Sequence, residues 1–158
     1  MATIGVYGFD SESFLRRLRH ADVRLLLDLR QRRGVRGPDY SWANSARLQR
    51  SLAAAEIGYR HVRELAPTTE LRRLQYREDD RLGVGKRDRV ALAPAYAERY
   101  TSEILGPYDL GALVAGLPGD AATALLCVER DAQACHRSLV AERLRTDHGV
   151  PVTDLRPD

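Results

Sequence analysis

Two short aliphatic runs, residues 23–29 (VRLLLDL) and 122–128 (ATALLCV), constrain the fold of this chain most. Each run is nearly continuous in apolar residues and too short for a buried helix, which is typical of a strand covered on both faces. Strands of this kind occur in parallel sheets, because the crossover connections of such sheets place helices on both faces. The two runs therefore predict an α/β domain.

Weaker signals on either side of these runs complete an alternating pattern. Further strands are predicted at residues 3–8, 58–62 and 150–155, and helices from Ser11 onward and at residues 45–56, 94–105, 109–117 and 135–146. The length of 158 residues is that of one domain. We expect a single α/β domain over residues 1–158, with an open, mostly parallel, Rossmann-like sheet of about five strands and helices on both faces.

Residues 63–93 interrupt this pattern with polar sequence. One helix is expected at residues 70–76, and periodicity is otherwise weak. The basic side chains of the segment are Arg63, Arg72, Arg73, Arg77, Arg81, Lys86, Arg87 and Arg89. Because a connection of this length is usually functional or disordered, we expect an irregular, arginine-rich excursion that acts as a lid over a cleft or as a flexible loop.

The basic residues of the chain are almost all arginine. Lys86 is the only lysine among 25 basic residues, which face 22 acidic ones and give a net charge of +3. The planar guanidinium suits phosphate and carboxylate, although a GC-rich coding bias would give the same composition. Composition alone therefore identifies no ligand.

Neither a membrane span nor a secretory signal is visible in the sequence. No apolar run approaches the roughly 18 residues that cross a bilayer, and the first residues lack a basic segment followed by an apolar one. Two cysteines are too few for a disulfide scaffold. We expect a cytoplasmic monomer or homodimer, without membrane contact, whose cysteines are free thiols.

Ligands of open α/β sheets bind at the carboxyl ends of the strands. Residues 7–10, 28–36 and 127–137 follow predicted strands and are therefore candidates for a site. In the first segment, Tyr7 is predicted to reach the cleft and contact the substrate, although an ordinary half-buried tyrosine would fit the same pattern.

The last of these segments, CVERDAQACHR, holds the strongest candidates. Cys135 is expected in the first turn of a helix, where free N–H groups and the helix dipole stabilise a thiolate or a bound phosphate. We predict Cys135 as a catalytic residue and Cys127, His136 and Arg137 as substrate-binding residues. The alternative is that both cysteines are small buried hydrophobic residues.

Two other thiol-based sites find little support in the sequence. Cysteine phosphatases and sulfurtransferases carry an arginine at the end of the loop after the thiol, whereas Ala141 and Gln133 stand at that spacing here. A zinc site would require the remote His20 or His61, and the chain has no CxxC pair. We predict neither a metal nor another cofactor.

Charged residues end two of the predicted strands. Asp28 and Arg30 are two residues apart on a strand, so they point to the same side and can pair or face the cleft together. Arg33 lies in the arginine-rich loop that follows, which suits a phosphate backbone or a solvated surface. Glu129 can act as a general acid or base, or pair with an arginine. We predict Asp28 and Glu129 as catalytic residues and Arg30 and Arg33 as substrate-binding residues.

Three stretches carry a family resemblance: TIGVYGFDSESFLRRL, VRLLLDLRQRRGVRGPDYSWANSARLQRSLAAAEIGYRHVREL and ALLCVERDAQACHRSLVAERL. Together they resemble the domain of unknown function 488 family of bacteria and archaea over nearly the whole chain. The most specific matches are its C-x-E, C-H-R and D-x-R positions, here Cys127, Glu129, Cys135, His136, Arg137, Asp28 and Arg30. Residues 65–68 lack the family's glycine pair, and residues 33–36 lack its serine-arginine turn. The resemblance implies a compact α/β domain with a common pocket.

Three functions are compatible with these residues. The first is an enzyme for a nucleotide-like or nucleic-acid substrate, with the anion held by arginine and a helix N-terminus and with Glu129 or Asp28 in acid/base or glycosidic-bond chemistry. The second is an enzyme with Cys135 as nucleophile, assisted by His136. The third is a non-catalytic nucleic-acid-binding module. We expect the first, as a hydrolase or transferase, provided that the strand ends gather around one pocket open to solvent.

Overall fold

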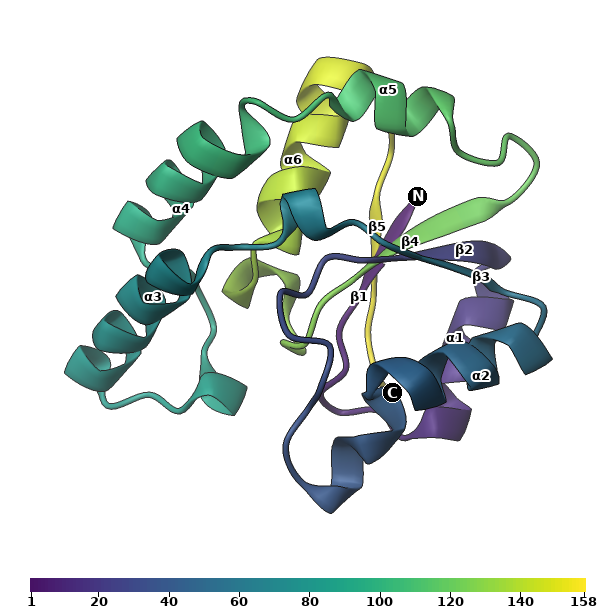
Figure 1. Ribbon diagram of the computed structural model, residues 1–158, viewed down its shortest axis with the longest axis horizontal. Coiled ribbons are helices and arrows are strands. Elements are labelled where there is room, and N and C mark those ends of the chain that lie inside the picture. The colour runs from purple at the N-terminus through teal and green to yellow at the C-terminus, as the bar shows by residue number, and fades with distance from the viewer.

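The five predicted strands form one parallel sheet in the computed structural model, which describes residues 1–158 (Figure 1). The strand order is β3-β2-β4-β1-β5, with all neighbours parallel. The strands are β1 (Ala2–Ile4), β2 (Val23–Asp28), β3 (Gly58–His61), β4 (Ala122–Leu126) and β5 (Thr153–Leu155). This sheet confirms the predicted α/β class.

The register of the sheet aligns the ends of its three central strands. β4 lies between β1 and β2, and Leu126 pairs with Ile4 on one side and with Asp28 on the other. The three strands therefore end at the same level. As a result, the residues that follow β1, β2 and β4 meet at one edge of the sheet.

Helices cover both faces of the sheet, as predicted (Figure 1). The helices α1 (Ser11–His20) and α2 (Ser45–Ala54) pack on one face, and α4 (Pro94–Tyr100), α5 (Leu110–Ala115) and α6 (Arg137–His148) pack on the other. Alternate strand residues enter the two cores, with Leu26 on the side of α1 and Leu27 on the side of α6. None of the helices is both long and apolar enough to cross a membrane.

The chain after β1 is tied directly to the chain after β4. The backbone N–H groups of Val6 and Tyr7 both donate to the carbonyl oxygen of Val128, at 3.0 Å. A Cβ atom at Gly5 would lie 1.9 Å from the carbonyl oxygen of Glu129. Only glycine permits this approach, which fixes the backbone that carries Glu129.

Two helix boundaries that bear on the site differ from the predicted ones. Within the arginine-rich excursion, α3 (Thr69–Leu82) is longer than predicted because Thr68 caps its start and Gly83, at φ 67°, ends it. The last helix begins at Arg137, with His136 as its N-cap, and Cys135 before it is extended. Cys135 therefore lies outside the first turn of α6, in which the sequence pattern had placed it.

Candidate functional site

A pocket of about 460 Å³ opens at the carboxyl ends of β1, β2 and β4. One side, which we call the strand-end floor, consists of residues that follow these strands or precede α6: Tyr7, Arg30, Cys127, Glu129, Cys135 and His136. The opposite side, which we call the helical wall, comes from α3 and the turns after it: Arg72, Gln75, Tyr76, Lys86, Arg89 and Leu92. The tertiary structure thus brings most of the predicted site residues together in one pocket.

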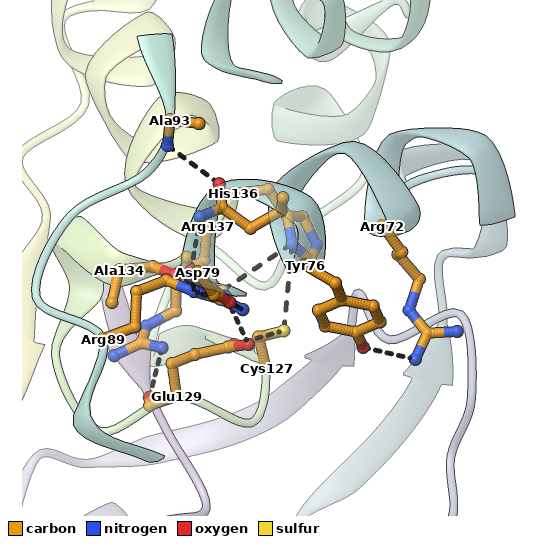
Figure 2. A network of polar contacts seen from close by, with 12 residues as sticks. Arg72, Tyr76, Asp79, Arg89, Ala93, Cys127, Glu129, Ala134, His136 and Arg137 are labelled. Atoms are coloured by element: carbon orange, nitrogen blue, oxygen red, sulfur yellow. Dashed lines mark hydrogen bonds and ion pairs between the residues drawn. The ribbon is translucent and has the colours of Figure 1, made fainter. Parts of the chain in front are cut away.

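Two thiols and an imidazole belong to the strand-end floor. Figure 2 labels Cys127 and His136, which lie close together there. Nδ1 of His136 lies 3.7 Å from Sγ of Cys135 and 3.9 Å from Sγ of Cys127. Nε2 of His136 lies 3.1 Å from the carbonyl oxygen of Leu29, which can only accept a hydrogen bond. Nε2 therefore carries a proton in both charge states of the ring, and Nδ1 faces the two thiols.

The two thiols differ in acidity because each affects the other. A hydrogen bond with Cys135, together with burial, raises the pKa of the Cys127 thiol. Burial also raises the pKa of the Cys135 thiol, but the hydrogen bond from Cys127 and the charges of His136 and Arg137 lower it below its ordinary value overall. Cys135 is thus the thiol that ionises more readily.

Glu129 is the only carboxylate that lines the pocket. Its side chain is buried, Oε1 lies 3.4 Å from Nη1 of Arg89, and Oε2 lies 3.5 Å from Sγ of Cys127. Burial, and then the negative charge of Cys135, raise the pKa of the Glu129 carboxyl against the opposing effect of Lys86 and Arg89. A carboxyl group with a raised pKa suits proton transfer near neutral pH.

Arg137 holds the loop that carries Glu129 and does not line the pocket. Its buried guanidinium donates to the carbonyl oxygens of Glu129 at 2.6 Å and Arg130 at 3.0 Å, and lies 3.7 Å from the Asp154 carboxylate on β5. The N–H groups in the first turn of α6 are also occupied, since Ser138 and Leu139 donate to the carbonyl oxygens of Cys135 and His136. An anion therefore finds few free donors at this helix N-terminus.

Asp28 and Arg30 form a buried ion pair beneath the pocket. Both carboxylate oxygens of Asp28 accept hydrogen bonds from Arg30, and one also accepts from the Tyr59 hydroxyl at 2.6 Å. The remaining contact of the Arg30 guanidinium is the carbonyl oxygen of Ala43 at 2.8 Å. Arg30 reaches the pocket, whereas Asp28 is fully buried and does not.

Of the predicted substrate-binding residues Tyr7 and Arg33, only Tyr7 lines the pocket. Tyr7 lines the pocket, and its ring packs edge-on against Tyr40. The Arg87 guanidinium lies over both rings, about 5 Å from each centre. Arg33 points away from the pocket, and its guanidinium donates to the hydroxyl of Tyr59 at 3.3 Å.

A buried polar network in the helical wall is absent from the sequence-based expectations (Figure 2). The Asp79 carboxylate pairs with Arg89 and accepts from Gln75 at 2.9 Å, and Oε1 of Gln75 accepts from the backbone of Ala93. Arg89 also reaches Glu129, so the network joins the wall to the floor. The available signal was the spacing of Leu71, Gln75 and Asp79, which places two polar residues on the buried face of α3.

Comparison with known proteins gives a family and no individual relative. No curated protein and no solved structure matches the chain. The family model described as Domain of unknown function DUF488 matches residues 10–144, which include β2, β4 and nearly all of the pocket-lining residues. The match confirms the resemblance seen in the sequence, and the chain therefore belongs to the DUF488 family.

Proposed function

We propose that this protein is an enzyme that acts on a nucleotide-like substrate, free or as one unit of a nucleic-acid strand. Basic side chains of the pocket bind the phosphate group, and Glu129 acts as the general acid or base. The transformed group is the nucleobase or its glycosidic bond, held near the strand-end floor. We further propose a cytoplasmic location, because that compartment keeps thiols reduced and both Cys127 and Cys135 are free.

The charge of the pocket lining is the observation that carries this proposal. Six basic side chains line the pocket against one carboxylate. Asp28 neutralises Arg30 and Asp79 neutralises Arg89, both from outside the lining. The other four make no ion pair: Arg32, Arg36, Arg72 and Lys86. Such an excess of unpaired cations favours an anionic ligand, and guanidinium groups favour phosphate in particular.

Aromatic side chains and the size of the pocket favour a nucleotide over inorganic phosphate. Tyr7, Tyr76 and Tyr96 line the pocket beside the basic groups, and aromatic rings stack on nucleobases. The volume of about 460 Å³ is within the usual range for small-molecule sites, roughly 300–1,000 Å³. A phosphate ion alone would leave most of it filled with water.

The two predicted catalytic carboxylates have different roles in this proposal. Glu129 lines the pocket and can contact a substrate. Asp28 is saturated by Arg30 and Tyr59, so it acts as a positioning residue that fixes the guanidinium of Arg30. Arg137 is also a positioning residue, because its guanidinium donates to the backbone carbonyl oxygen of Glu129.

A cysteine-nucleophile enzyme is the second candidate, favoured by the 3.7 Å separation of Cys135 Sγ and His136 Nδ1. One variant and one measurement separate the candidates. Glu129→Gln should abolish a carboxylate-dependent reaction and leave a thiol-dependent one, and mass spectrometry should detect a covalent substrate adduct on Cys135 only if the reaction depends on the thiol. Under the leading proposal Glu129→Gln lowers turnover by roughly 10²- to 10⁴-fold, the range of general acid–base catalysis, while nucleotide binding remains.

Calorimetry with nucleoside 5′-monophosphates and the matching nucleosides tests the ligand class directly. We expect the monophosphates to bind at least about tenfold more tightly, since a charge-assisted hydrogen bond contributes about 1.5–3 kcal/mol. Arg32→Gln should weaken monophosphate binding about tenfold by the same reasoning. Arg50→Gln removes an exposed, unpaired arginine of α2 outside the pocket and serves as the matched control. Equal affinity for nucleoside and monophosphate contradicts the proposal.

Incubation of the protein with nucleotides and single-stranded oligonucleotides, followed by mass spectrometry of the products, tests catalysis. A released base or an altered base supports an enzyme. Binding that weakens steeply with salt, with no product and no effect of Glu129→Gln, indicates the non-catalytic nucleic-acid-binding module instead.

A further inference from the structure

We infer that Cys127 Sγ, Cys135 Sγ and His136 Nδ1 bind one Zn²⁺ ion, whose fourth position faces the pocket. The ion would make the reaction proposed above a hydrolysis, because it would hold and activate a water molecule beside Glu129. This consequence rests on the proposed function. Binding of the ion does not, because it involves no substrate.

The two nitrogen–sulfur separations match those of a metal site, and the two sulfur atoms lie within 4.8 Å of each other. A tetrahedral zinc ion with Zn–S and Zn–N distances of about 2.3 and 2.0–2.1 Å holds its ligand atoms about 3.6–3.8 Å apart. The Nδ1 atom lies 3.7 Å from one sulfur and 3.9 Å from the other, and all three ligand atoms lie within 4.8 Å of one another. An ion could therefore be accommodated with small side-chain adjustments.

The orientation of the imidazole also suits metal binding. Histidine ligands of metal ions commonly donate the other ring N–H to a backbone carbonyl or a carboxylate, which fixes the tautomer and the ring plane. Nε2 of His136 is 3.1 Å from the carbonyl oxygen of Leu29, and the ring packs against that of Tyr100. Nδ1 is thereby directed at the two sulfur atoms.

The backbone that carries the ligands is well supported. Cys127 directly follows β4, and its N–H donates to Ile4 of β1 at 3.2 Å. Cys135 donates through its N–H to Ala132, and His136 is the N-cap of α6. Neither His20 nor His61 is needed, because the fold returns residues 135–136 to the end of β4.

The ligand types and their number point to a particular kind of metal centre. Two thiols and one imidazole select zinc over magnesium or calcium, which prefer oxygen ligands. Three protein ligands with an open fourth position are typical of catalytic zinc sites, whereas structural sites have four. All three ligands line the pocket, and Oε2 of Glu129 lies 3.5 Å from Sγ of Cys127. Glu129 thus lies where it can accept the proton of a zinc-bound water.

Metal binding is measured on the full chain, reduced with a phosphine and dialysed against Zn²⁺. Elemental analysis should give one zinc per chain. Replacement of zinc by Co²⁺ should give the near-ultraviolet thiolate-to-cobalt bands and the intense visible bands of a tetrahedral site, which identify thiolate ligands in the unaltered protein. No bound metal in reduced protein whose two thiols both react with a thiol reagent would overturn the inference, as would a cobalt spectrum without thiolate bands.

Variants assign the ligands. Cys127→Ser, Cys135→Ser and His136→Gln should each weaken Zn²⁺ binding, measured by competition with a chromophoric chelator, by more than the roughly 10- to 100-fold caused by loss of an outer-shell partner. His61→Gln is the matched control, because Nε2 of His61 also contacts a backbone carbonyl, 2.9 Å away, but lies outside the pocket. Circular dichroism checks that each variant is folded.

Glu129→Gln should keep one zinc per chain. Loss of the metal in this variant would make Glu129 a fourth ligand and overturn the open position.

Nucleotide binding is measured separately, so a zinc-free protein that binds nucleoside monophosphates contradicts only the metal site. A zinc protein that binds no nucleotide contradicts only the proposed function. With zinc present, Cys135 is a ligand, and the cysteine-nucleophile mechanism is excluded.

Discussion

The strand-end floor and the helical wall face the same pocket but are held in place by different forces. Backbone hydrogen bonds between the chain segments that follow parallel strands fix the floor, as in the donation of Val6 and Tyr7 to Val128. Side-chain contacts fix the wall, chiefly the pair of Asp79 and Arg89. We therefore expect the wall to open locally at a lower free energy than the floor, whose movement would disrupt the sheet.

The largest effect is expected from the floor. Arg30→Met should lower the free energy of unfolding by roughly 3–5 kcal/mol, because it leaves the Asp28 carboxylate buried without its partner. Urea denaturation measures the change. The double variant Asp28→Leu, Arg30→Met should recover part of the loss, since it removes both charges. A single variant as stable as the natural protein would show that the floor does not depend on this pair.

Gly5→Ala should be destabilising by about 3 kcal/mol, the upper end of overpacking effects, because the new Cβ meets backbone atoms of Glu129 that cannot move aside. Thermal and urea denaturation provide the measurement. Gly119→Ala is the control, since a Cβ there meets no atom within 4 Å. Equal stability of both variants would contradict the tight junction of β1 and β4.

A smaller and more local effect is expected from the wall. Asp79→Asn should cost about 1–3 kcal/mol, because the buried Arg89 guanidinium loses its charged partner. Amide hydrogen exchange should speed up over residues 69–92 and remain unchanged over residues 122–129. Asp80→Asn, at an exposed neighbouring position without an ion pair, is the control. Faster exchange in both regions would mean that floor and wall open as one unit.

The smallest effect concerns the contact between wall and loop. Arg87→Gln removes a cation from above the Tyr7 and Tyr40 rings. The free energy of local opening of residues 83–92 should fall by about 0.5–1 kcal/mol. Amide exchange over residues 83–92 measures this change. Arg73→Gln, on the exposed face of α3, should leave exchange there unaltered. If the two variants are indistinguishable, the cation–π contact does not hold the segment.

The floor could be predicted from the sequence, and the wall could not. Buried strands produce local apolar runs, so the ends of β2 and β4, and with them Arg30 and Glu129, follow from residues close in the chain. The pairing of Asp79 with Arg89 depends on the path of the chain beyond α3, which no local pattern encodes. The start of α6 was misplaced by two residues because Cys135 is extended and the His136 side chain is fixed by contacts with Cys127 and Leu29.

The sequence by itself determined a parallel α/β sheet and the chemical groups at its strand ends, because burial on two faces and the succession of strands and helices are properties of neighbouring residues. Only the tertiary structure decided that Cys127 and Cys135 share one histidine nitrogen, that Asp28 is sealed from the pocket, and that α3 supplies its opposite side. These features depend on the insertion of β4 between β1 and β2 and on the packing of residues far apart in the chain, and such long-range contacts leave no periodic trace in the sequence.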